Sequence, residues 1–83
     1  METQNIKSLN TADINERCII KYIECAEKEK LRLYDLGFVP FSSVVPLYTS
    51  FLSGTRAYLV KGSIIALRHE YGEAIKITEE GRA

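Results

Sequence analysis

The sequence predicts a mostly β protein with one short helix inserted after the first strand. Five short segments are rich in β-branched and aromatic residues and end at glycine, proline or polar residues, as strands do. One stretch, residues 26–37, instead spaces its apolar residues at the helical period. Short strands lose their exposed edges most readily by closing into a barrel. We therefore expect a small five-stranded antiparallel β-barrel, in a single domain over residues 1–83 with flexible ends at about 1–8 and 79–83.

The first two expected strands differ in regularity. Arg17–Glu24 is a run of isoleucine, cysteine and tyrosine typical of a strand. Alternation along it would place two sets of side chains on opposite faces: Ile19, Lys21 and Ile23, and Cys18, Ile20 and Tyr22. Ser43–Thr49 contains Pro46, which cannot donate a ladder hydrogen bond. That strand is expected at a sheet edge, or with Pro46 in a bulge or with its nitrogen facing outward.

The remaining strands are separated by turns that contain glycine. Gly62 opens the two-residue connection Gly62-Ser63, which is typical of a type II′ β-hairpin. The strands are expected at Tyr58–Lys61, Ile64–Arg68 and Glu73–Thr78, with a loop over Ser50–Ala57 and a turn around residues 70–72.

The expected helix has a well-marked end. Its apolar stripe consists of Ala26, Leu33 and Leu36. Gly37 suits the left-handed position that follows a helix, and Phe38 would then pack back on Leu33, as in a Schellman ending. Pro40 prevents the helix from resuming. We expect these residues to fix the path of the chain from the helix into the next strand, and not to take part in catalysis or binding.

Charge and composition exclude several classes of function. Eleven basic and eleven acidic residues give a net charge of zero, which removes the electrostatic footprint of nucleic-acid binding. No apolar run approaches the ~18 residues of a membrane span, and the N-terminus has no apolar core of a secretory signal. We expect a cytoplasmic protein without membrane insertion. Cys18 and Cys25 fit a reduced compartment, as one buried residue and one strand-end residue.

Catalysis is not expected from these residues. The single histidine, His69, has no nucleophile near it in sequence, and the glycines form no phosphate-binding pattern. Metal binding is harder to dismiss, because His69, Glu70 and Glu73 cluster within five residues and suit ions such as Fe²⁺. Because no tight ligand spacing supports them, we expect no required cofactor and at most weak binding of a divalent transition metal.

Exposed apolar residues point instead to a contact surface. Phe51 and Leu52 precede Ser53-Gly54 in a loop and have no periodic partner. An apolar loop tip more often marks a contact than a requirement of the fold. Phe41 and Tyr58 are further contact candidates, although Tyr58 fits the lining of the barrel equally well.

Two motifs carry a resemblance to a known family. The chain from about Leu9 to Ile77 resembles the FeoA family, ferrous iron transport protein A, through LGFVP at residues 36–40 and GSIIALR at residues 62–68. In this resemblance Gly37, Phe38, Pro40 and Gly62 are the structural motif residues. It implies an SH3-like barrel with an inserted helical segment, a module also seen at the C-terminus of DtxR-type repressors.

The resemblance also implies a partner. Members of this family are thought to act by contact with the cytosolic region of a FeoB-type ferrous-iron permease, which carries a GTPase domain. Three places depart from the family pattern: Phe41 replaces a common glycine, the loop over residues 51–56 differs, and Asn15-Glu16 replaces a glycine-ending turn. Asparagine tolerates the left-handed conformation, so the last change is compatible with the fold.

Three functions follow as hypotheses. The first is an accessory protein of ferrous-iron uptake that docks on the permease. The second is a metal-binding or metal-responsive SH3-like module, and the third is an SH3-like domain for another peptide or protein. The sequence leaves the docking face and the oligomeric state undetermined.

Overall fold

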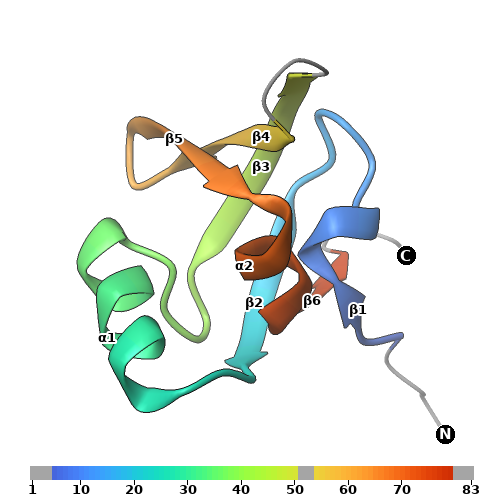
Figure 1. The fold of residues 1–83 in the computed structure, drawn as a ribbon. Helices are drawn as coiled ribbons and strands as arrows, with labels where there is room; N and C mark the ends of the chain where they lie inside the picture. The colour runs from blue at the N-terminus through green and yellow to red at the C-terminus, as the bar shows by residue number, and fades with distance from the viewer. Residues whose placement is uncertain (1–4, 51–53, 80–83) are drawn as a thin grey trace, which may run out of the picture.

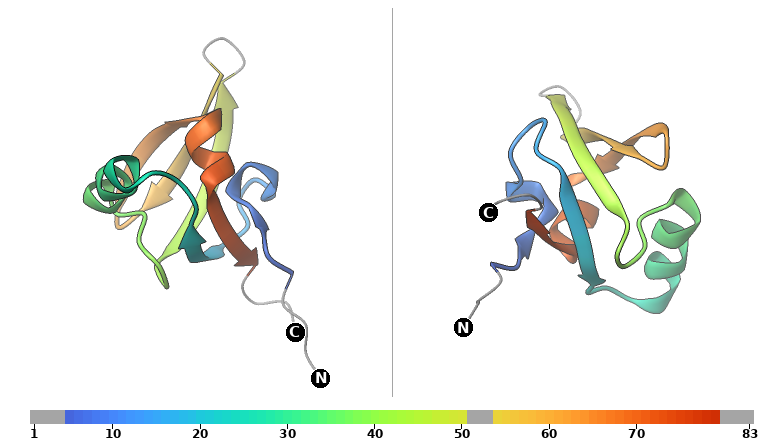
Figure 2. Two further views of the ribbon diagram at one scale, coloured as in Figure 1. Left: turned by 60° about the horizontal axis from the view of Figure 1, so that its bottom comes forward. Right: turned by 180° about the vertical axis from the view of Figure 1, so that it is seen from behind.

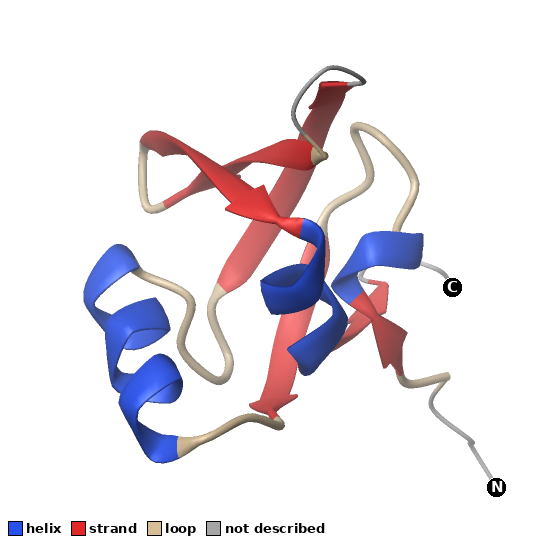
Figure 3. Cartoon of the chain, in the orientation of Figure 1, coloured by secondary structure: helices blue, strands red, loops and turns tan. Residues whose placement is uncertain are grey.

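Six antiparallel strands form one sheet, in the order β1-β6-β2-β3-β4-β5 (Figure 1). The computed structural model describes residues 5–50 and 54–79. In chain order the elements are β1 (Lys7–Ser8), the 3₁₀ helix η1 (Leu9–Thr11), β2 (Cys18–Ile23), α1 (Glu27–Leu36), β3 (Ser43–Ser50), β4 (Thr55–Val60), β5 (Ser63–Arg68), α2 (His69–Ala74) and β6 (Ile75–Glu79). Figure 3 shows how the helices interrupt the strands along the chain.

The mostly β, SH3-like architecture with a helix inserted after the first long strand confirms the expected fold class, but two details were wrong. The sheet has six strands rather than five, and it does not close into a barrel. The additional strand is β1, in a segment expected to be flexible. Lys7 and Ser8 pair with Ile77 and Lys76, and Lys7 Nζ forms a 2.8 Å ion pair with Glu79. Glu79, also assigned to a flexible end, is the last residue of β6.

Side chains and α2 bridge the open side of the sheet. Arg56 on β4 donates hydrogen bonds to the carbonyls of Leu9, Asn10 and Ala12, at 3.2, 3.0 and 2.7 Å. Asn10 Nδ2 in turn donates to the carbonyl of His69, the first residue of α2, at 2.8 Å. The segment after β1 is therefore tied to both β4 and α2. The views in Figure 2 place this segment and α1 on opposite sides of the molecule.

Bulges in β2 and β3 break the predicted alternation. In β2 the register with β6 shifts between Ile20 and Tyr22, so Ile20 and Ile23 are buried and Tyr22 is exposed. Strict alternation had placed Ile20 and Ile23 on opposite faces. In β3 the register with β4 shifts between Pro46 and Tyr48. The bulge alternative for Pro46 is thus confirmed and the edge alternative is wrong, because β3 lies between β2 and β4.

The β4–β5 hairpin has its turn one residue earlier than predicted. Val60 pairs with Ser63, so the connection is Lys61-Gly62 rather than Gly62-Ser63. Both residues have positive φ, 51° and 80°, which indicates a type I′ turn instead of II′. Lysine tolerates this position less well than asparagine or glycine, and the strand pairing on both sides therefore imposes it.

The C-terminus of α1 confirms the predicted cap. Gly37 has φ 109°, its N–H donates to the Tyr34 carbonyl at 2.9 Å, and the Phe38 N–H donates to the Leu33 carbonyl at 3.0 Å. This is the double hydrogen-bond arrangement of a Schellman motif. The predicted stripe is only partly buried, because Leu33 is in the core whereas Ala26 and Leu36 are exposed.

The turn expected around residues 70–72 is a short helix, α2. Gly72 lies inside it and is buried against the Asn10 side chain, so that a Cβ at this position would overlap the amide group. A glycine in the middle of a six-residue segment lowers its helix propensity and indicates a turn locally, although the segment also contains two glutamates and an alanine. The tertiary contact with η1 stabilises the helix instead.

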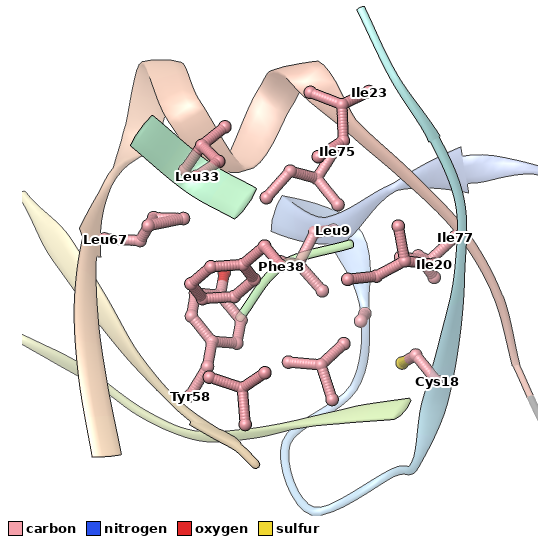
Figure 4. Packing of buried hydrophobic residues seen from close by; sticks show 13 residues of the cluster. Leu9, Cys18, Ile20, Ile23, Leu33, Phe38, Tyr58, Leu67, Ile75 and Ile77 are labelled. Carbon is pink, nitrogen blue, oxygen red and sulfur yellow. The ribbon is translucent and has the colours of Figure 1, made fainter. Parts of the chain in front are cut away.

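The core lies between the sheet, α1 and η1, and draws on almost every element (Figure 4). Its centre is the Phe38–Tyr58 pair, whose ring centroids are 6.2 Å apart with planes at 89°. The buried apolar residues around it are Leu9, Ala12, Cys18, Ile20, Ile23, Leu33, Val44, Val60, Leu67, Ile75 and Ile77. Phe38 thus links the helix cap to the barrel-like core.

Candidate functional site

Phe41 is the most exposed of the large apolar residues described, at 77% of its surface. It follows Pro40 in a turn in which the Ser42 N–H donates to the Val39 carbonyl at 3.1 Å. Its φ of 73° lies in the left-handed region that a type II turn requires at its third position. Glycine is the usual residue there, which accounts for the glycine of the family pattern.

The turn is held in place by β2. The Phe41 N–H donates to the Ile20 carbonyl at 2.7 Å, and the Ile20 N–H donates to the Ser42 carbonyl at 3.0 Å. Lys21 Nζ lies 5.9 Å from the centroid of the Phe41 ring, within range of a cation–π interaction. A rigid backbone therefore presents an exposed aromatic ring with a cation beside it.

Tyr58 is not a surface residue, and this contact candidate was wrong. Its side chain is fully buried against Phe38. Burial raises the pKa of the Tyr58 hydroxyl, and the nearby Arg56 guanidinium opposes the rise. The β4 register turns Tyr58 inward, so the alternative interpretation as core lining is the correct one. Phe51 and Leu52 lie outside the described residues.

The predicted metal ligands are only partly brought together. Asn10 Nδ2 lies 3.2 Å from His69 Nδ1 and 3.5 Å from Glu73 Oε1, so both side chains face the same amide. Glu73 also accepts a hydrogen bond from Ser8 Oγ at 3.4 Å. Within residues 5–50 and 54–79, no three His, Cys, Asp or Glu side chains approach closely enough to hold a metal ion. The cluster serves to join α2 to η1.

The two cysteines lie apart and both are free. Burial raises the pKa of the Cys18 thiol to about 11, and desolvation also raises the pKa of the half-buried Cys25 thiol. A raised pKa lowers the fraction of reactive thiolate, so neither environment activates its cysteine as a nucleophile. The prediction of one buried and one strand-end cysteine is confirmed, because Cys25 follows β2 by two residues.

The described residues line hollows at the surface, two of which are candidate binding sites. One, of about 400 Å³, is lined by Asn10, Thr49, Gly54, Thr55, Arg56 and His69. The other, of about 220 Å³, lies between α1 and β5 and is lined by Glu29, Arg32, Leu33, Leu36, Ala66, Leu67, Arg68 and Tyr71. We name this second hollow the α1–β5 groove. The sequence did not predict this groove, because its two walls come from α1 (Glu27–Leu36) and β5 (Ser63–Arg68), which are far apart along the chain.

The strand order and the inserted helix α1 define a small SH3-like domain. A family model described as "FeoA domain" matches residues 7–79. The chain therefore belongs to the FeoA domain family, which confirms the resemblance carried by LGFVP and GSIIALR. No curated protein matches it significantly. None of the described helices has the length and apolar character needed to cross a membrane.

Solved structures show the same fold at low sequence identity. An NMR structure of a FeoA-like protein from Clostridium acetobutylicum is 17% identical, with a TM-score of 0.83, over 99% of this chain and 94% of that one. The FeoA protein from Chlorobium tepidum is 19% identical, with a TM-score of 0.81, over 89% and 70%.

The fold also occurs as part of a repressor. The crystal structure of ScaR with bound Zn²⁺ is 17% identical, with a TM-score of 0.79, over 94% of this chain but only 38% of that one. This agrees with the expectation that the module is shared with metal-dependent repressors.

Proposed function

We propose that this chain is a cytoplasmic accessory protein of ferrous-iron uptake that acts by contact with the cytosolic region of a FeoB-type permease. The match of the FeoA domain model to residues 7–79 supports this proposal most strongly. Contact rather than catalysis fits the chemistry of the described residues, because the thiols have raised pKa values and His69 contacts an asparagine.

Phe41 is the contact residue that the geometry supports best. A non-glycine residue with positive φ in a turn is strained, and such strain persists where the surroundings or a function require it. The ring is 77% exposed and adds little to the core, so a role in folding does not explain it. An exposed aromatic beside a cation is the type of side chain that anchors interfaces.

The test is an NMR titration of the ¹⁵N-labelled chain with the cytosolic domain of the permease. We expect shift changes around Phe41 and Lys21, and a roughly tenfold or greater loss of affinity for Phe41→Ala. Tyr48→Ala is the matched control, because Tyr48 is also aromatic and is 58% exposed. Binding of the wild type without any effect of Phe41→Ala would assign the contact elsewhere, and no shift changes near millimolar concentration would reject the function.

A metal-responsive module is the second candidate, favoured by the fold shared with ScaR. Its ligands would be His69, Glu70 and Glu73, which are all exposed, although only His69 and Glu73 face a common neighbour. Anaerobic titration with Fe²⁺ tests it. Paramagnetic broadening confined to these residues at micromolar metal would support it, and uniform broadening only at millimolar metal would reject it.

A further inference from the structure

We propose that the α1–β5 groove binds an extended acidic and apolar peptide segment of a partner protein, which adds to β5 as a further strand. This site is separate from the Phe41 contact and goes beyond the proposed function. Three observations carry it: a free strand edge, an apolar floor next to that edge, and unpaired cations at the rim. Figure 1 shows α1 and β5 on the same side of the molecule.

The strand edge is free because β5 ends the sheet and pairs only with β4. Val60 and Ser63 close the two-residue turn, so hydrogen-bonded and non-hydrogen-bonded pairs alternate from there along the ladder. The N–H and C=O of Ile64 and Ala66 and the N–H of Arg68 therefore point away from β4. Within residues 5–50 and 54–79, no backbone hydrogen bond reaches these groups from another element.

The floor of the groove supplies apolar contacts for a peptide side chain. Leu33 and Leu67 are buried at its base, and Leu36 and Tyr71 contribute to its walls. Leu36 is 43% exposed although it lies on the face of α1 expected to be covered. A volume of about 220 Å³ next to a strand edge accommodates one or two aliphatic side chains. An edge strand facing a helix across an apolar groove is a recurrent arrangement for binding peptides by strand addition.

Basic side chains at the rim of the α1–β5 groove favour an acidic peptide. Arg32 and Arg68 line the groove, and Lys61 lies against Gly37 at the C-terminal end of α1. Among the described residues, Lys7 and Glu79 form an ion pair. Arg32, Arg68 and Lys61 form none with a described acidic residue. Glu29 is the single acidic residue of the lining. The groove therefore favours a peptide that carries carboxylates beside its apolar residues.

A second copy of this chain fits the groove poorly. Antiparallel pairing of two β5 strands would place Lys61 of one copy near Arg68 of the other, and like charges at an interface are unfavourable. The same basic ends that attract an acidic peptide thus oppose self-association at this edge.

The experiment uses the full chain and a capped peptide of about eight residues, alternating isoleucine and glutamate, which is long enough to span β5. We expect shift changes at Ile64, Ala66, Arg68 and Leu36, and slower hydrogen exchange of the three β5 amides in the complex. A peptide with lysine in place of glutamate should bind at least tenfold more weakly.

Two variants separate strand addition from general attraction. Ala66→Pro removes one outward N–H without removing a bond to β4, and should weaken binding at least tenfold. The double variant R32E/R68E should weaken it by a similar factor while leaving the fold intact. Lys30→Glu, on α1 but outside the lining of the groove, is the matched control and should bind as the wild type does, as should Phe41→Ala.

Each remaining outcome overturns the proposal. Shift changes only away from β5 would show that the peptide binds outside the groove. Equal binding by the wild type and R32E/R68E would show the same. No binding at millimolar peptide excludes the stated chemistry. Sedimentation as a dimer that Ala66→Pro converts to a monomer would assign the edge to self-association instead. Binding of the permease domain is measured separately, so its result decides the proposed function and not this site.

Discussion

At the scale of single residues, Phe41 combines exposure with an unfavourable backbone conformation. A non-glycine residue in the left-handed region costs about 1–2 kcal/mol, whereas glycine adopts it without a steric penalty. The cation–π interaction of the Phe41 ring with Lys21 Nζ, 5.9 Å from the ring centroid, offsets little of this cost, because the site is exposed to solvent. The folded protein would therefore be more stable with glycine at this position.

We predict that Phe41→Gly increases the free energy of unfolding by up to about 1 kcal/mol, since relief of strain exceeds the entropic cost of glycine. Phe41→Ala is the control, because it removes the ring but keeps the Cβ that causes the strain. Urea unfolding followed by circular dichroism measures both. A Phe41→Gly variant less stable than Phe41→Ala would show that the turn is not strained.

At the scale of the elements, the two helices form for different reasons. α1 ends where its own sequence dictates, because Gly37 and Phe38 supply the capping hydrogen bonds locally. α2 is only six residues long and contains Gly72. It is held by contact with Asn10, which donates to the His69 carbonyl and lies where a Gly72 side chain would project.

We predict that Gly72→Ala lowers the free energy of unfolding by about 1–3 kcal/mol, because the added methyl group overlaps the Asn10 amide. In an unobstructed helix the same change would stabilise by about 1 kcal/mol. The sign should therefore reverse when Gly72→Ala is introduced into an Asn10→Ala background. Chemical denaturation of the four variants of this cycle measures the coupling, and additive effects would contradict the proposed contact.

At the scale of the whole molecule, the open sheet is held together by groups other than strand pairing. The two edge strands β1 and β5 do not meet. Arg56 bridges the gap from β4 with donors to three carbonyls at and beyond η1, and also donates to Thr49 Oγ1 at 3.2 Å. A single guanidinium therefore satisfies backbone acceptors that a closing strand pair would otherwise satisfy.

We predict that Arg56→Met destabilises the protein by roughly 2–4 kcal/mol, because it removes the guanidinium donors of the Asn10 and Ala12 carbonyls and one of the two donors of the Leu9 carbonyl. Arg32→Met is the matched control. Arg32 is an exposed arginine without an ion pair among the described residues, and its replacement should change stability by less than about 0.5 kcal/mol. Hydrogen exchange should accelerate at the amides of residues 9–12 in the Arg56 variant first. Equal stability of the two variants would show that Arg56 does not close the fold.

The candidate contact sites were predictable only where local sequence decides exposure. Phe41 follows Pro40 in a turn, and turns lie at the surface, so its exposure was predictable. Tyr58 was ambiguous because a strand offers two faces, and only the register with β3 and β5 turned it inward. The α1–β5 groove could not be predicted, since it exists only where two distant elements come together.

Near neighbours in the sequence were enough to predict the capped end of α1, the presence of a hairpin near Gly62 though not its turn residues, the left-handed Asn15 with φ 69°, and the family through its two motifs. Tertiary structure decided the bulges in β2 and β3, the helix α2, the pairing of β1 and the open sheet. The reason is physical. Caps and turns are stabilised by hydrogen bonds within a few residues, whereas register, bulges and edges depend on which distant strand supplies the partner.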